Sequence, residues 1–378
     1  MNDQADLQAG SILDRVLNRK QNDDIEHFNP LDILSNLLKI LTSREEEILR
    51  RRHGLHAKTP ETLEHIGAQY NVTRERIRQI ESGAIAKLQK YNDSRHAVSS
   101  VVDAITAVLD QHGGVMREEV LLNQLLGNSE DSQASRAATL FIMQFLLRDR
   151  VKHFQTTEAF YPAWQLTVAP IHLVDETIKN VQTILEAEGK PLPVKEVLDG
   201  LRKTAFGIEH QYQLTDAAVL SYIGVSTHIA KNPYDEYGLA GWGTIVPRRM
   251  SDKIYLVLKK VGKPLHFNDI TRLINETKFD HRVAYPPTVH NELILNDRYV
   301  LVGRGIYALK EWGYKPGVVV DILTSILKKE QRPMTRDELV AEVLKQRMVK
   351  RNTIHLALTN RKKFIKDLKG AYSLVPPV

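Results

Sequence analysis

The most informative polar side chains of this sequence lie within residues 71–82, which read NVTRERIRQIES. If this segment is helical, with about 100° between neighbours, its polar side chains occupy a sector of about 140°. That sector holds Arg74, Glu75, Arg78, Gln79 and Ser82. The opposing sector, about 80° wide, is apolar and holds Ile77, Ile80, Ala84 and Leu88. Two guanidiniums, a carboxylate and a carboxamide are the groups that pair with guanine, cytosine and adenine edges in a major groove.

The preceding residues supply the elements that would position such a helix. Thr62 can cap a short helix that buries Ile66, and residues 67–71 then turn the chain. This pattern predicts a helix-turn-helix. Thr42 or Ser43 can cap a third, supporting helix, because a glutamate follows three residues later.

Two longer segments carry a family resemblance, LTSREEEILRRRHGL and TLEHIGAQYNVTRERIRQIESGAIAKLQKY. Residues 39–91 resemble region 4 of the sigma-70 family of bacterial RNA polymerase initiation factors, the module that binds the promoter element near position −35 and docks on the polymerase flap. The resemblance implies that the positions of Arg74, Glu75, Arg78 and Gln79 contact bases. It implies that the positions of Arg44, Arg52 and Thr62 contact phosphates.

The sequence also departs from this family. No other segment resembles the aromatic-rich region 2 that melts the −10 element, so we expect that the protein does not open a promoter alone. His53 stands where the family usually has an aromatic residue. Gly83 is a poor helix former, which predicts an early end or a bend in the recognition helix. The alternative is a helix-turn-helix that keeps the packing pattern without promoter recognition.

Composition agrees with a DNA-associated cytoplasmic protein of several domains. The chain has 378 residues, a formal net charge of +6 and no cysteine, which excludes disulfides, thiolate metal sites and a cysteine nucleophile. No stretch approaches the ~20 apolar residues of a membrane span, and the N-terminus lacks a signal sequence. Residues 39–91 carry 11 basic and 7 acidic side chains, and residues 315–378 carry 14 and 6. Residues 92–314, with 24 and 26, suit protein partners better than DNA.

Beyond residue 95 the sequence repeats with a period of about 65 to 75 residues. Each unit opens with an apolar helix, passes through a basic or proline-marked turn into a second helix, and closes with an aromatic strand. The predicted fold is mainly α with small β-hairpins, in which the helix-turn-helix is followed by four tandem winged-helix-like domains. The predicted boundaries are 1–38 for an acidic extension, 39–91 for the sigma-like module, and 96–170, 171–247, 248–314 and 315–378 for the four units.

The third unit shows the repeat best. Its KPLHFNDI and DRYVLVGRGIYAL segments resemble the HARE-HTH family of winged helices, found in the delta subunit of bacterial RNA polymerase. The predicted third helix starts at Pro286, and the predicted hairpin turns at Gly303 and Arg304. Such modules bind either DNA or protein, so this resemblance alone does not decide the partner.

The fourth unit has the most basic surface, which predicts a possible second DNA surface together with Arg304. Its exposed polar groups are predicted to be Lys350, Arg351, Asn352, Arg361, Lys362 and Lys363. A solvated basic face is the equally acceptable interpretation.

Residues 1–38 contain two helical patterns. The second, which includes Leu31, Leu34 and Leu38, can pack on the sigma-like module. The first, Ile12 to Leu17, has no obvious packing partner, and is either a mobile partner-binding helix or a frayed extension.

The sequence gives no indication of catalysis, a cofactor or a metal. His53, His56 and His65 lack an acidic residue at matching spacing. Residues 303–305 and 241–243 lack the lysine and the context of a phosphate loop.

Three functions remain open. The first is a transcription factor that binds promoter-like double-stranded DNA, the RNA polymerase flap, or both. The second is a polymerase-associated scaffold without sequence-specific DNA binding, and the third is the targeting subunit of a restriction or defence system.

Overall fold

The computed structural model describes residues 29–56, 59–95, 97–126, 133–154, 157–314, 317–347, 349–367 and 370–375. As predicted, the chain is mainly helical with small antiparallel sheets. It divides into two compact units, Met1–Ala230 and Lys231–Val378. The predicted pattern from Ile12 to Leu17 lies outside the described residues. Within the described residues, no helix is long and apolar enough to cross a lipid bilayer.

The first unit begins with the helix-turn-helix domain, whose helices are α2 (Pro30–Leu38), α3 (Ser43–Arg52), α4 (Leu63–Gln69) and α5 (Arg74–Arg95). Thr42 caps α3 in the predicted manner: its hydroxyl accepts from the backbone N–H of Glu45, whose carboxylate accepts from the backbone N–H of Thr42. Ile48, Ile66 and Ile77, from three different helices, are fully buried together. This small cluster fixes the angle between α4 and α5.

Helix α5 differs from the expectation at Gly83, because it continues unbroken through this residue to Arg95. Ala84 and Leu88 follow directly and are fully buried. Burying a leucine contributes about 1.5–3 kcal/mol, which outweighs the ~1 kcal/mol that glycine costs in a helix. Tertiary packing therefore keeps α5 helical at Gly83 despite the low helix propensity of glycine.

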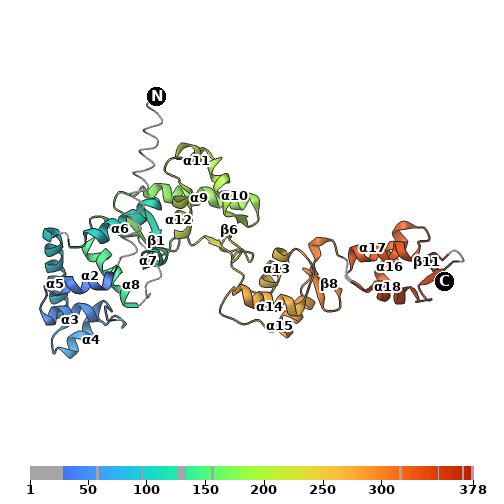
Figure 1. Cartoon of the computed structure of the whole chain (residues 1–378), viewed down its shortest axis with the longest axis horizontal. Coiled ribbons are helices and arrows are strands. Elements are labelled where there is room, and N and C mark those ends of the chain that lie inside the picture. The colour runs from blue at the N-terminus through green and yellow to red at the C-terminus, as the bar shows by residue number, and fades with distance from the viewer. Residues whose placement is uncertain are drawn as a thin grey trace, which may run out of the picture. The chain divides into compact units, whose positions relative to one another are not determined.

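The next segment of unit 1 folds against the helix-turn-helix domain. Its elements are α6 (Ser99–Gln111), β1 (Val115–Arg117), α7 (Glu118–Leu126), α8 (Gln133–Phe141), the π-helix η1 (Ile142–Leu146), β2 (Val151–Phe154) and β3 (Ala163–Leu166). The three strands form an antiparallel sheet in the order β1-β3-β2. Leu34 and Leu88 share one apolar core with Phe141 and Trp164. Helix α2 packs against α8, as Figure 1 shows.

Unit 1 continues with α9 (Ile171–Glu188), β4 (Leu192–Pro193), α10 (Val194–Arg202), α11 (Ala205–Glu209) and α12 (Asp216–Val225). Helix α12 packs on β1, where the Tyr222 hydroxyl donates to the carbonyl oxygen of Gly113 at 2.7 Å. A Cβ on Gly113 would lie 2.5 Å from that hydroxyl oxygen, so the contact requires glycine. Strand β5 (Ile229–Lys231) spans the division between the units.

Unit 2 contains two sets of three helices, each with its own hairpin (Figure 1). After β6 (Glu236–Leu239), the first set comprises α13 (Met250–Val261), β7 (Leu265–His266), α14 (Phe267–Thr277), α15 (Pro286–Leu295), β8 (Tyr299–Gly303), β9 (Ile306–Leu309) and the 3₁₀ helix η2 (Lys310–Trp312). Its strands pair in the order β7-β9-β8, and Tyr307 is buried with Ile254 and Ile270 of the helices. The helix beginning at Pro286 and the turn at Gly303 and Arg304 are where the sequence predicted them.

The second set comprises α16 (Val319–Glu330), α17 (Arg336–Gln346), α18 (Arg351–Leu358), β10 (Phe364–Lys366) and β11 (Tyr372–Leu374). Ile322, Leu339 and Ile354 contribute one side chain each from the three helices to its core. Phe364 of the hairpin is buried in the same core. The two opening helices, α16 and α17, and the closing strand with Tyr372 follow the order predicted for each repeat unit.

Candidate nucleic-acid interface

The first two turns of α5 present a polar surface that we call the reading face, formed by Arg74, Glu75, Arg78 and Gln79. All four side chains are exposed. On the opposite side of the same helix, Ile77, Ala84 and Leu88 are fully buried. The separation of faces predicted from the helical period is therefore present, and the side chains able to pair with base edges point to solvent.

The turn before α5 fixes the direction of the reading face. The carbonyl oxygen of Gly67 accepts from the backbone N–H of Val72 at 3.0 Å, and a Cβ on Gly67 would lie only 2.8 Å from the Val72 carbonyl oxygen. Asn71 adopts a left-handed φ of 55°. The hydroxyl of Thr73 then accepts from the backbone N–H of Arg76, which satisfies one of the free donors at the start of α5.

Two members of the reading face pair with each other in the free protein. The Arg78 guanidinium donates to both carboxylate oxygens of Glu75, at 2.9 and 2.7 Å. This bidentate hydrogen bond holds the pKa of Glu75 below its usual value, so the carboxylate is ionised at neutral pH. Both side chains are more than half exposed, so water screens their attraction and the pair can open for other partners.

The other two members are held less tightly. Gln79 accepts one hydrogen bond through Oε1 from Arg76, at 3.2 Å. Within the described residues, no hydrogen bond or ion pair engages the Arg74 guanidinium. Arg74 is therefore available to a phosphate or a guanine without first breaking a protein contact.

Two of the three predicted phosphate-binding residues are also accessible. Arg44 is exposed, and its guanidinium lies 5.3 Å from the centre of the Tyr70 ring. Thr62 is exposed and caps α4, where its hydroxyl oxygen accepts from the backbone N–H of His65 at 3.2 Å. Because a hydroxyl can accept and donate at once, Thr62 can still donate its own hydrogen to a phosphate.

Arg52, the third predicted phosphate-binding residue, is directed into the protein. Its Nη1 donates to the carbonyl oxygen of Glu61 at 2.9 Å, and its Nε lies 3.7 Å from a carboxylate oxygen of Glu81. The side chain is 36% exposed. A phosphate contact by Arg52 therefore requires an exchange of partners, which Arg44 and Thr62 do not need.

The sequence did not indicate what covers the other side of the helix-turn-helix domain. The ring of His53 lies edge-on to Phe141 and Phe145, with ring centres 5.1 and 5.2 Å apart. Its Nε2 lies 3.0 Å from Glu81, and the amide of Gln89 donates to the carbonyl oxygen of Phe145. His53 thus fills its aromatic position by packing on α8 and η1, and the reading face stays free.

The residues of the predicted second DNA surface lie in unit 2 and are all exposed. One group lies at the start of α18, a second follows its end, and Arg304 lies on the turn between β8 and β9. The full set is Lys350, Arg351, Asn352, Arg361, Lys362, Lys363 and Arg304.

The histidines of the helix-turn-helix domain do not converge. His56 lies 3.9 Å from Glu47, and His65 lies 3.5 Å from Glu61, while His53 faces Glu81. Across the described part of the chain, no three histidine or acidic residues are grouped so that they could hold a metal ion.

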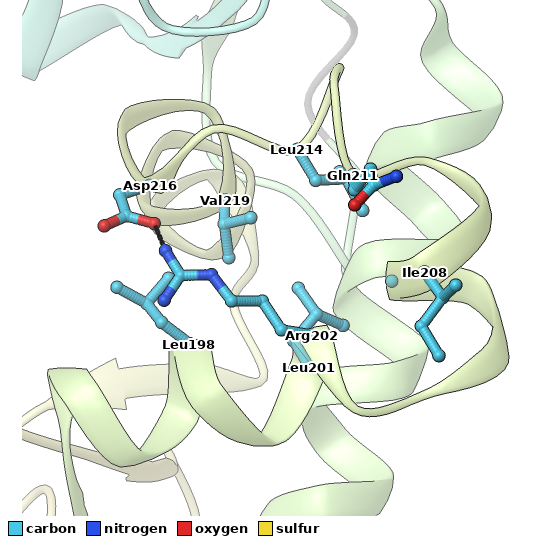
Figure 2. Close-up of a pocket in the computed structure, with 9 residues that line it drawn as sticks. Leu198, Leu201, Arg202, Ile208, Gln211, Leu214, Asp216 and Val219 are labelled. Atoms are coloured by element: carbon cyan, nitrogen blue, oxygen red, sulfur yellow. Dashed lines mark hydrogen bonds and ion pairs between the residues drawn. The ribbon is translucent and has the colours of Figure 1, made fainter.

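A pocket in unit 1, drawn in Figure 2, is one of several hollows in the described residues that could bind a small ligand. Leu198 and Leu201 of α10, Ile208 of α11 and Val219 of α12 line it, together with Leu214 from the segment between α11 and α12. Its two charged side chains, Arg202 and Asp216, are joined to each other by the ion pair drawn in the figure. The charges at this pocket therefore neutralise each other, and the reading face remains the stronger candidate site.

Comparison with known proteins also points to the helix-turn-helix domain that carries the reading face. Residues 37–90 match the family model for sigma-70, region 4. An RNA polymerase sigma factor RpoD of Neisseria gonorrhoeae is 38% identical over 87 residues, which is 23% of this chain and 14% of that protein. The SigA sigma factors of Clostridium acetobutylicum and Microcystis aeruginosa are 50% and 52% identical over 62 and 59 residues. These matches cover 16% of this chain, and 16% and 14% of the two proteins. The helix-turn-helix domain is thus similar to sigma-70 region 4, and the chain spans about a sixth or less of each relative's length.

Proposed function

We infer that this protein is a bacterial DNA-binding transcription factor, sigma-like in its promoter-recognition domain. Helix α5 enters the major groove of a −35-like element, or the domain docks on the RNA polymerase flap, or both. The observation that carries the proposal is the exposure of Arg74, Glu75, Arg78 and Gln79 on a helix whose opposite side is buried. Similarity to sigma factors over residues 37–90 supports it.

Each member of the reading face has a chemical role in this proposal. Arg74 and Arg78 donate to guanine O6 and N7 or to a phosphate, Glu75 accepts from cytosine N4, and Gln79 pairs with adenine N6 and N7. The Glu75–Arg78 pair opens on binding, or stays joined while its outer atoms contact neighbouring base pairs. Arg44 and Thr62 contact the flanking phosphates and set the position of the helix.

The remaining parts of the chain have supporting roles. We propose that the four predicted repeat units are winged-helix modules, with the one around α13–α15 of the HARE-HTH type. They add contacts to upstream DNA or to polymerase subunits. We propose that the protein acts in the cytoplasm together with polymerase and does not open promoters alone.

Binding-site selection on randomised duplexes tests the proposal. Glu75→Ala should lower the preference for cytosine at one position by about 5- to 150-fold, because alanine cannot accept a hydrogen bond from cytosine N4, while total affinity changes little. Lys90→Ala is the control for Arg74→Ala, because it removes an exposed cation from the same helix outside the reading face. If the base preference were unchanged in both Glu75→Ala and Arg74→Ala, the reading face would not be the surface that contacts bases.

The near-neutral segment 92–314 favours one alternative, a polymerase-bound scaffold whose sigma-like domain only docks. Co-purification with polymerase followed by footprinting on promoter DNA separates the two functions. Protection of a −35-like site that Arg74→Ala abolishes supports the transcription factor. Co-purification without any protected site supports the scaffold.

A further inference from the structure

The last 64 residues carry 14 basic and 6 acidic side chains, and five of the basic ones lie at the two ends of one short helix. Lys350 and Arg351 are at the start of α18, and Arg361, Lys362 and Lys363 follow its end. We call these five residues the terminal cation patch. All five side chains are exposed.

The ion pairs described within residues 317–375 involve other side chains than those of the terminal cation patch. Arg332 pairs with Glu338 at 2.9 Å, and Lys345 pairs with Glu342 at 2.5 Å, both involving α17. Within residues 317–347, 349–367 and 370–375, no carboxylate lies in ion-pair distance of a member of the terminal cation patch. Adjacent like charges without partners repel each other, which a polyanionic ligand would relieve.

The dimensions of α18 limit which polyanion fits. An eight-residue helix is about 12 Å long, and the major groove of B-form DNA is about 12 Å wide. Between the two groups of cations, α18 exposes Asn352, Thr353 and Leu356, which are small enough to enter a groove and carry no charge. Arg304 lines the same groove of unit 2 as Thr353 and Asn360 and adds another cation beside α18.

Other nucleic acids fit this surface less well. Single strands are held by exposed aromatic rings, but Phe364 is buried and the ring of Tyr372 is half-buried with Lys366 above it. The deep, narrow major groove of an RNA duplex does not admit side chains. Double-stranded DNA is therefore the ligand that matches both the charge of this surface and the length of α18.

We propose that the terminal cation patch binds the two phosphate rows that flank a major groove of double-stranded DNA, with α18 lying across the groove, independently of the reading face. This second contact is insensitive to sequence, because its charged groups contact only phosphates. It rests on the proposed function and deepens it, because it assigns the contacts to DNA outside the promoter element to a named surface, while sequence recognition stays on α5.

The test compares two triple variants of the full chain. Arg361→Gln, Lys362→Gln and Lys363→Gln remove three cations of the patch. As the matched control, Lys328→Gln, Lys329→Gln and Lys345→Gln remove three exposed cations of α16 and α17 in the same segment. Fluorescence anisotropy on a random-sequence 30-base-pair DNA duplex, at several salt concentrations, gives the affinity and its salt dependence.

The patch variant should lose affinity roughly tenfold or more, and the slope of log K against log salt should fall by about 2 to 3, close to 0.9 for each phosphate that is no longer neutralised. The control should change neither. The same loss is expected in an Arg74→Ala background, which separates failure of this inference from failure of the reading-face proposal. Equal behaviour of the two triple variants, or an equal loss on single-stranded DNA or an RNA duplex, would overturn the inference.

Protection of lysines in the unmodified chain gives an independent readout that does not depend on a variant folding. Duplex DNA should slow acetylation of Lys350, Lys362 and Lys363 but not of Lys328 and Lys329. Equal protection of both groups contradicts the proposal.

Discussion

Replacing Gly83 by alanine should stabilise the helix-turn-helix domain. Gly83 is exposed in the interior of α5, its φ is not in the left-handed region, and an added Cβ would meet no atom within 4 Å. Alanine therefore gains the full helix-propensity difference of about 0.5–1 kcal/mol. In a cooperative unit of about 150–250 residues, this corresponds to a rise in Tm of roughly 1–4 °C.

Gly67→Ala is the matched substitution with the opposite expectation. Gly67 is buried, and its new Cβ would lie 2.8 Å from the Val72 carbonyl oxygen and 3.5 Å from the Arg74 backbone nitrogen. These are backbone atoms, so no side-chain rotation relieves the overlap. Overpacking of this kind costs about 1–3 kcal/mol, more than the ~0.5–1 kcal/mol gained from helix propensity. The domain should be destabilised, and the start of α5 should shift.

Hydrogen–deuterium exchange of the full chain, read in peptides from α4 and α5, measures both effects locally. Gly83→Ala should slow exchange across residues 80–90 and leave duplex preference unchanged, whereas Gly67→Ala should accelerate exchange in both helices. Faster exchange in Gly83→Ala would show that α5 is interrupted at this residue. Wild-type exchange in Gly67→Ala would show that the turn is not closely packed. Either result would contradict the corresponding prediction.

Three further outcomes are expected. Asn71→Val should destabilise the domain in urea unfolding by about 1–2 kcal/mol, because a β-branched residue tolerates the left-handed φ of 55° poorly, whereas Asn71→Gly should be tolerated. The pKa of Glu338 is lowered from 4.5 to about 2, mainly by the hydrogen bond from the backbone N–H of Thr335. The ionised carboxylate therefore stabilises the fold fully above pH 4.5, and this stabilisation is lost as the pH falls toward 2. NMR titration should give that pKa, and Glu338→Gln should lower stability at pH 7 but not at pH 2. Burial raises the pKa of Tyr222 from 10.0 to about 12, so the free energy of unfolding falls as the pH rises from 10 through 12. Tyr222→Phe should abolish this part of the loss. At pH 7 the same variant should cost about 0.5–1.5 kcal/mol, because it lacks the hydrogen bond to Gly113.

Local patterns predicted the helices and the exposed face, because both depend on the side-chain period alone. The alternation that separates Arg74 and Arg78 from Ile77 is complete within two helical turns. The turn at Gly303 and Arg304 was likewise predictable, because glycines and flanking β-branched residues mark a hairpin locally. Such features need no knowledge of distant contacts.

The contacts that the sequence did not predict join residues far apart in the chain. Nothing local indicates that His53 packs on Phe141 and Phe145, or that Leu88 shares one buried core with Trp164. The internal position of Arg52 depends on Glu81, which is 29 residues away in the sequence, so a family pattern of phosphate-binding positions could not reveal it. The Glu75–Arg78 hydrogen bond is local, but it was not predicted either, because it depends on the rotamers of two exposed side chains.

The two candidate DNA surfaces differ in chemistry in a way that suits different tasks. The reading face contains a carboxylate, which phosphates repel, so its binding energy depends on finding the correct bases. The terminal cation patch contains no acidic side chain, so its binding energy comes from phosphates and is the same on any sequence. A protein whose specific surface includes an anion gains affinity for DNA most readily from a separate, purely cationic surface. The segregation of charge within this chain, with a near-neutral segment between two basic ones, provides that separation.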